Sequence, residues 1–137
     1  MVNREVVLNR LDHLKRNLEY LKGLHNYKKE EFSNDPDIYL RYERALHLAV
    51  EAVIDLGNHI IADQGLRTPE SNRDVFKILA EHNYLEKDIS ESLMKMAGFR
   101  NILVHDYLDL NRELEYEIMK NNIQDIEIFT KIVAGLV

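Results

Sequence analysis

The residue types best suited to chemistry gather in one short segment, Arg100–Tyr107. It holds an arginine, an asparagine, a histidine, an aspartate and a tyrosine within eight residues, interleaved with Ile102, Leu103 and Val104. An apolar run flanked by such polar groups places them at the edge of a packed interface. This segment is therefore the first candidate for an active site.

These residue types suit the cleavage of RNA, whose 2′-hydroxyl can attack the adjacent phosphate. The step needs a group that moves protons near neutral pH, which a histidine supplies. It also needs a fixed cation for the phosphate and its developing charge, which the planar fork of an arginine supplies. We assign proton transfer to His105 and phosphate binding to Arg100, with Asn101 orienting either His105 or the phosphate. The scheme uses no metal ion and no cofactor.

Helical geometry brings only some of these residues together. Each residue of an α-helix advances by about 100°, so Asn101 and His105, four apart, share a face. Arg100 and His105 diverge by about 140° on that count. The length of the Arg100 side chain closes part of this gap, or Gly98 lets the helix bend before the segment. Tyr107 joins His105 only if the helix unwinds there or if a second subunit completes the site.

The string Arg100–His105 resembles the signature of HEPN ribonucleases, in which four to six residues separate an arginine from a histidine and a polar residue follows the arginine. Its extension to Tyr107 resembles the HepT toxins of HEPN/MNT toxin–antitoxin pairs. The resemblance also covers Glu43–Ile61 and Met96–Phe99, and so extends over most of the chain.

The resemblance implies a metal-independent endoribonuclease toxin of a type VII-like pair. Its partner would be a minimal nucleotidyltransferase antitoxin, which neutralises the toxin by transferring AMP to Tyr107. It also implies a two-fold homodimer that brings two copies of the segment to one cleft. An AMP group on Tyr107 would set an anion beside Arg100 and occupy the phosphate site.

Other interpretations of the same residues remain open. A non-catalytic HEPN module could use Arg100 and His105 to bind a nucleotide or a partner, or the chain could be a purely structural helical dimer. Arg100 and His105 could also form an exposed ion-binding pair that caps a helix. Tyr107 could be a packing tyrosine with a hydrated hydroxyl.

The rest of the sequence predicts long helices that position this segment. Residues 2–32 form the first expected helix, and Ser33–Pro36 ends it with residues that favour caps and turns. Residues 37–64 form a second helix, apolar on most sides and therefore buried, within which Gly57 indicates close packing. The apolar stripe of the first helix advances in steps of four and three, at Val7, Leu11, Leu14, Leu18 and Leu21.

Three further helices are expected, over residues 73–81, from about Asp88, and over residues 111–134. The string Asp88–Glu91 resembles a capping box. No alternating strand pattern competes. The prediction is an all-α, up-and-down bundle of four or five helices that forms one domain over residues 1–137.

Composition and charge limit the possible partners and cellular compartment of the protein. The 137 residues contain no cysteine and carry a net charge of −6. An acidic chain is a poor general binder of nucleic acid, so an RNA site requires a local basic cleft, a second subunit or a transient substrate. The N-terminus lacks a signal-peptide pattern, and no uninterrupted apolar run is long enough to span a bilayer. We expect a cytoplasmic protein without membrane contact.

Other titratable residues are candidates for metal ligands or for buried charges. Asp106 and Asp109 lack supporting ligand spacing and are interpreted as solvated, and His47 and His59 as structural histidines. Asp55 lies in the most apolar stretch, where an unpaired carboxylate is costly. Its expected partner is Arg44, Asn58 or a residue of Arg100–Tyr107.

Overall fold

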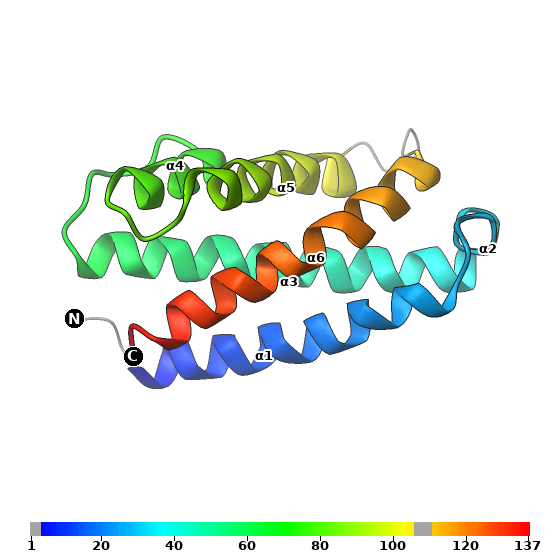
Figure 1. Cartoon of the computed structure of the whole chain (residues 1–137), viewed down its shortest axis with the longest axis horizontal. Helices are drawn as coiled ribbons and strands as arrows, with labels where there is room; N and C mark the ends of the chain where they lie inside the picture. The colour runs from blue at the N-terminus through cyan, green and yellow to red at the C-terminus, as the bar shows by residue number, and fades with distance from the viewer. Residues whose placement is uncertain (1–3, 106–110) are drawn as a thin grey trace.

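The computed structural model describes residues 4–105 and 111–137, with the backbone only at 101–105. Within these ranges it contains α-helices, one 3-10 turn and no β-strand, so the all-α prediction is confirmed. Four long helices alternate in direction along the bundle, and two short ones lie in their connections (Figure 1). The elements are α1 (Arg4–Lys22), η1 (Gly23–Asn26), α2 (Lys29–Asn34), α3 (Pro36–Asp63), α4 (Asn72–Glu81), α5 (Lys87–His105) and α6 (Arg112–Ala134).

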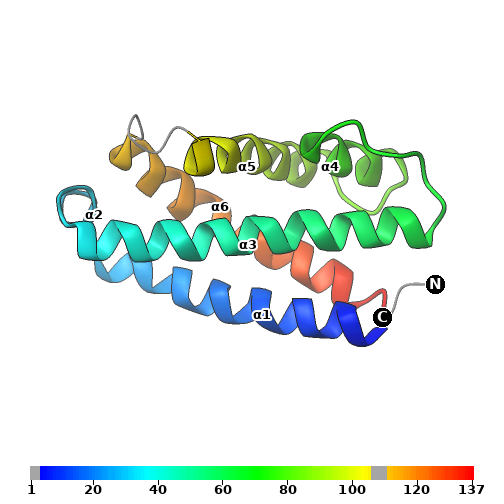
Figure 2. The same ribbon diagram turned by 180° about the vertical axis from the view of Figure 1, so that it is seen from behind.

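Helix α3 is the centre of the bundle. It contacts α1, α2, α4, α5 and α6. In Figure 2 it lies between α5 and α1 with α6 behind it, whereas α6 is in front in Figure 1. By length and composition alone α3 could cross a membrane, but its most apolar stretch is 56% buried inside the protein. Packing in the core therefore accounts for its apolar character.

The first predicted helix is correct in its buried face and wrong in its length. All five leucine and valine residues of the predicted stripe are buried. The helix ends at Lys22, however, and η1 and α2 follow it. A Cβ atom on Gly23 would lie 3.0 Å from the hydroxyl of Tyr42, so the chain passes close to α3 there. The backbone of Lys28 then donates to Glu31 at 3.1 Å and starts α2 afresh.

Side-chain caps mark the starts of α3 and α6. The Asp35 side chain accepts from the backbone of Asp37 at 3.0 Å with Pro36 in the first helical position, as expected for the start of α3. Asn111 caps α6 by accepting from the backbone of Leu114 at 3.1 Å. Both starts lie within one residue of the prediction.

Helix α5 differs from the prediction in two details. It starts at Lys87, so Asp88 lies inside its first turn. Ser90, predicted to belong to a capping box, is buried and donates to the carbonyl of Phe76 in α4 at 2.9 Å. The helix also continues through Gly98 without interruption.

Candidate active site

The last part of α5 carries the predicted segment. Met96, Ala97 and Phe99 are buried against the core, which fixes the rotation of the helix about its axis. Arg100 emerges at the edge of this buried surface with 26% of its side chain exposed. Packing upstream therefore places one predicted site residue at a solvent-accessible border between α5 and α3.

Arg100 is held by a carboxylate from α3. Its Nε donates to Oε1 of Glu51, whose side chain is 38% exposed. His47, one turn earlier on α3, places Nε2 4.0 Å from the same oxygen. A guanidinium, a carboxylate and an imidazole thus meet at one partly open spot between two helices.

The structure describes the side chains of only some of the predicted site residues. Asn101 and His105 belong to α5, but their side chains lie outside the described residues. Tyr107, with Asp106 and Asp109, lies outside them altogether. Their assigned roles remain predictions, and Arg100 is the predicted site residue whose surroundings are known.

Glu51 belongs to a longer polar row. His47, Glu51, Asp55 and His59 follow each other at intervals of four on α3, and we call this row the α3 stripe. Residues at this spacing lie on one face of a helix. Glu51 contacts Arg100 of α5 and Asp55 contacts Arg10 of α1, the two helices between which α3 lies in Figure 2.

The partners of Asp55 differ from those expected. Its carboxylate pairs with Arg10 of α1, and the Nε2 of His59 is 3.9 Å away. Asn58 instead donates to the carbonyl of Ile54 at 3.2 Å. The predicted pairing with Arg44, Asn58 or the segment is therefore wrong, because packing of α1 on α3 brings Arg10 across. Two arginines from two flanking helices meet successive carboxylates of the stripe.

A second ionic cluster, which the sequence analysis missed, lies where α6 begins. Nη2 of Arg112 is 3.1 Å from Oε1 of Glu43, and its guanidinium lies 4.3 Å from the ring centre of Tyr39. Glu115 is fully buried. Burial, the charge of Glu43 and a hydrogen bond to that carboxyl raise the pKa of Glu115 to about 9. Glu115 is therefore neutral at physiological pH. The sequence feature that could have revealed this cluster is Glu43, a glutamate in the predicted second helix, which is apolar on most sides.

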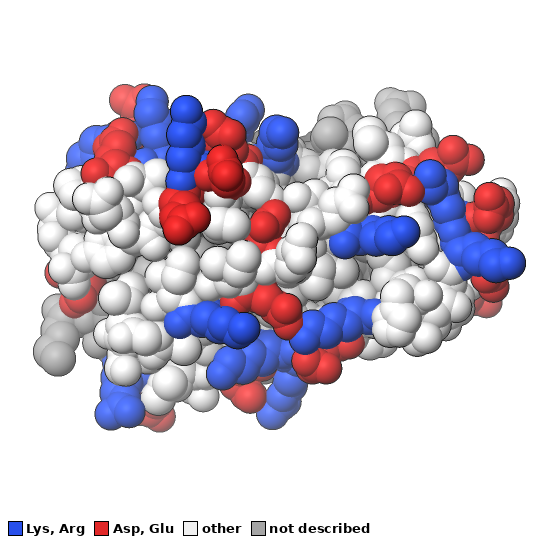
Figure 3. All heavy atoms as spheres, in the orientation of Figure 1, with Lys and Arg blue, Asp and Glu red and all other residues white. Residues whose placement is uncertain are grey.

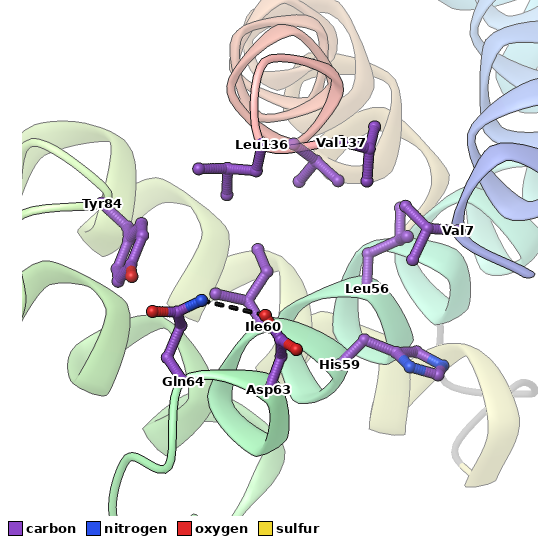
Figure 4. Close-up of a pocket in the computed structure, with 10 residues that line it drawn as sticks. Val7, Leu56, His59, Ile60, Asp63, Gln64, Tyr84, Leu136 and Val137 are labelled. Carbon is purple, nitrogen blue, oxygen red and sulfur yellow. Dashed lines mark hydrogen bonds between the residues drawn. The ribbon is translucent and has the colours of Figure 1, made fainter. Parts of the chain in front are cut away.

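In the described part of the chain, no metal centre lies at Arg100, and a small apolar pocket lies elsewhere. Among the described residues, no three His, Asp or Glu side chains converge as metal ligands. A cavity of about 60 Å³ lies where Val7, Ile60, Tyr84 and Leu136 approach one another, with Gln64 donating to Asp63 at 2.9 Å on its rim (Figure 4). This cavity lies at the C-terminal end of α3, away from the part of α5 that carries Arg100 (Figure 1).

Comparison with known families decides the relationship. Residues 12–133 match the model of the family described as Ribonuclease HepT-like. The chain belongs to this family. The curated relatives of this HepT-like chain include the mRNA nuclease HepT of Shewanella oneidensis, 31% identical over 134 residues that cover 96% of this chain and 98% of the relative. They also include the tRNA nuclease HepT of Aphanizomenon flos-aquae, 26% identical with 96% and 90% coverage.

A solved structure extends the similarity to three dimensions. The tri-AMPylated Shewanella oneidensis HEPN toxin in complex with MNT antitoxin superposes with a TM-score of 0.87 at 30% identity, over 96% of this chain and 98% of the toxin chain. The resemblance to HEPN and HepT proteins expected from the Arg100–Tyr107 segment is thus confirmed over nearly the whole HepT-like chain.

Proposed function

We propose that this chain is an RNA-cleaving toxin of a HEPN/MNT toxin–antitoxin pair. The observation that carries the proposal is its end-to-end similarity to an mRNA nuclease HepT and to a HEPN toxin solved with an MNT antitoxin. One relative is named for mRNA and another for tRNA, so the proposal extends to RNA as the substrate class. Cleavage would occur in the cytoplasm.

The catalytic scheme assigns one task to each side chain. Arg100 binds the scissile phosphate and stabilises charge on it, and His105 transfers the proton of the 2′-hydroxyl or of the leaving oxygen. Asn101 orients one of them. The partly exposed position of Arg100 between α5 and α3 supports access of a phosphate to its guanidinium. The scheme is metal-independent.

Neutralisation of the toxin would act on the same phosphate-binding arginine. The cognate nucleotidyltransferase antitoxin would transfer AMP to Tyr107, seven residues after Arg100. The added phosphate would compete with RNA for the Arg100 guanidinium. The tri-AMPylated state of the similar HEPN toxin supports this mode of control.

A two-fold dimer through the outer face of α3 would complete the site. Leu40 and Leu48 are 44% and 39% exposed, and both project within about 60° of Glu51 around the helix. Arg44, also exposed, lies between them. A second copy would cover the two leucines and double the positive charge near Arg100. This would offset the acidity of the chain, whose charges of both signs intermingle on the face in Figure 3.

Substitution of the two assigned residues tests the function. Arg100→Ala and His105→Ala should each lower the rate of RNA cleavage by about 10²-fold or more and abolish growth inhibition, with an unchanged circular dichroism spectrum. Arg10→Ala is the matched control, because Arg10 also pairs with a carboxylate of the α3 stripe. If both variants cleave RNA as well as the unaltered protein, the assignment of Arg100 and His105 is wrong. If the unaltered protein cleaves no RNA, the chain is instead the non-catalytic binding module.

A further inference from the structure

Glu51 sits where it can control the direction of the Arg100 side chain. It lies on the central helix between Val50 and Val53, which are 3% and 2% exposed. Its backbone is therefore fixed by the core, while its carboxylate reaches the surface and accepts from Nε of Arg100 on α5.

We propose that Glu51 is a positioning residue for the reaction, acting through Arg100; this inference rests on the proposed function. An arginine side chain loses much rotamer freedom when it is fixed. A guanidinium presents its N–H groups on more than one edge of a plane, so a carboxylate on the Nε edge orients the whole plane. Glu51 thereby prepares the guanidinium for the phosphate before RNA binds.

His47 of α3 lies beside the same carboxylate. Its Nε2 is 4.0 Å from the same Oε1 atom that Arg100 contacts, and only 22% of its side chain is exposed. The imidazole is therefore a partly buried neighbour of the Glu51 carboxylate.

If Glu51 has a neutralising role instead, its removal should change the rate of RNA cleavage in the opposite direction. If Glu51 merely neutralised Arg100, the phosphate would have to displace it, and removing Glu51 would speed cleavage. If Glu51 positions Arg100, removing it slows the chemical step, because a misplaced group costs up to about 10²-fold in rate. Steady-state kinetics on an RNA substrate separate the two roles.

The chain offers a closely matched control at Asp55. Asp55 is one turn from Glu51 on the same stripe, has the same 38% side-chain exposure, and likewise lies between an arginine and a histidine. Its arginine is Arg10 of α1, which has no part in the proposed reaction. A general loss of charge pairing on this face would affect both variants alike.

The experiment compares Glu51→Ala, Glu51→Gln and Asp55→Ala for kcat, KM, thermal stability and oligomeric state. We expect Glu51→Ala to lower kcat about ten- to hundredfold with a smaller change in KM. Glu51→Gln should recover most of kcat, since its amide oxygen still accepts from Nε. Asp55→Ala should keep the unaltered kcat and lose a similar amount of thermal stability.

Three outcomes would overturn the inference: a Glu51→Ala variant as fast as or faster than the unaltered protein, no recovery in Glu51→Gln, or an equal loss in Asp55→Ala. Arg100→Ala in the same assay keeps the two proposals apart. Cleavage that depends on Arg100 but not on Glu51 defeats this inference alone. If the unaltered chain cleaves no RNA, the proposed function itself fails.

Discussion

Gly57 of α3 lies directly against Val75 of α4. A Cβ atom on Gly57 would come within 2.5 Å of Cγ1 of Val75, whereas non-bonded carbon atoms pack about 3.5–4.0 Å apart. Both residues are buried, and valine has few rotamers with which to give way. The contact seats α4, and with it α5, on the central helix.

Overpacking of the core by Gly57→Ala should cost about 1–3 kcal/mol. Alanine brings back about 1 kcal/mol in a helix interior, so we expect a net loss of up to about 2 kcal/mol, because the contact is as short as 2.5 Å. Gly98→Ala is the control, because among the described residues its Cβ would meet only Cδ of Arg73, at 3.9 Å. Urea unfolding should show a loss for the first variant and a small gain for the second. Equal stability of the two would contradict the close approach.

Periodicity and local chemistry made much of the fold predictable. The buried stripe of α1, the proline at the start of α3, the Asn111 cap and the close packing at Gly57 all follow from residue type and spacing. The break after Lys22 was not predicted; there Gly23 lies close to the hydroxyl of Tyr42, nineteen residues later in the sequence.

The carboxyl pair at Glu43 and Glu115 makes stability depend on pH. The pKa of Glu115 rises from an ordinary value of 4.5 to about 9 in the folded protein. The protonated form is therefore favoured by folding, and this contribution is complete below about pH 4.5 and is lost as the pH rises through 9. Stability should fall over that interval.

Glu115→Gln should flatten this dependence, because the amide stays neutral at every pH. One pKa unit corresponds to about 1.4 kcal/mol, so the variant should exceed the unaltered protein by at least about 1 kcal/mol near pH 9. Denaturant unfolding between pH 5 and 9 measures the difference. The exposed Glu113→Gln should leave the pH dependence unchanged. A parallel pH profile for Glu115→Gln would show that the carboxyl ionises freely.

The proposed dimer surface predicts the effect of a charge at Leu48. A glutamate there would be buried without a partner in the dimer, which costs several kcal/mol. We expect Leu48→Glu to be a monomer by light scattering and to lose RNA cleavage while its helix content remains. Ile128→Glu, on α6 with a similar exposure of 40%, should stay dimeric and active. A dimeric Leu48→Glu variant would place the interface elsewhere.

Only the part of the candidate site that lies on a single helix could be predicted from the sequence. Residue types and spacing single out Arg100 and His105, because both belong to one short segment. Glu51 and Asp55 needed the packing of α5 and α1 against α3, which periodicity does not specify. Asp55 was noticed as a carboxylate in an apolar stretch, yet its partner Arg10 lies forty-five residues earlier in the sequence.

The phenolic oxygen of Tyr107 is the atom on which the proposed neutralisation depends. Tyr107→Phe removes this acceptor and keeps the ring, so a chain co-expressed with its antitoxin should gain no AMP mass at this position and should still inhibit growth. Tyr20→Phe is the control, since Tyr20 is 40% exposed on α1 and contacts Arg41 rather than Arg100. It should be modified and neutralised like the unaltered protein. Mass spectrometry of the intact chain and of its peptides measures both, and a neutralised Tyr107→Phe variant would mean that the antitoxin acts through another residue or by binding alone.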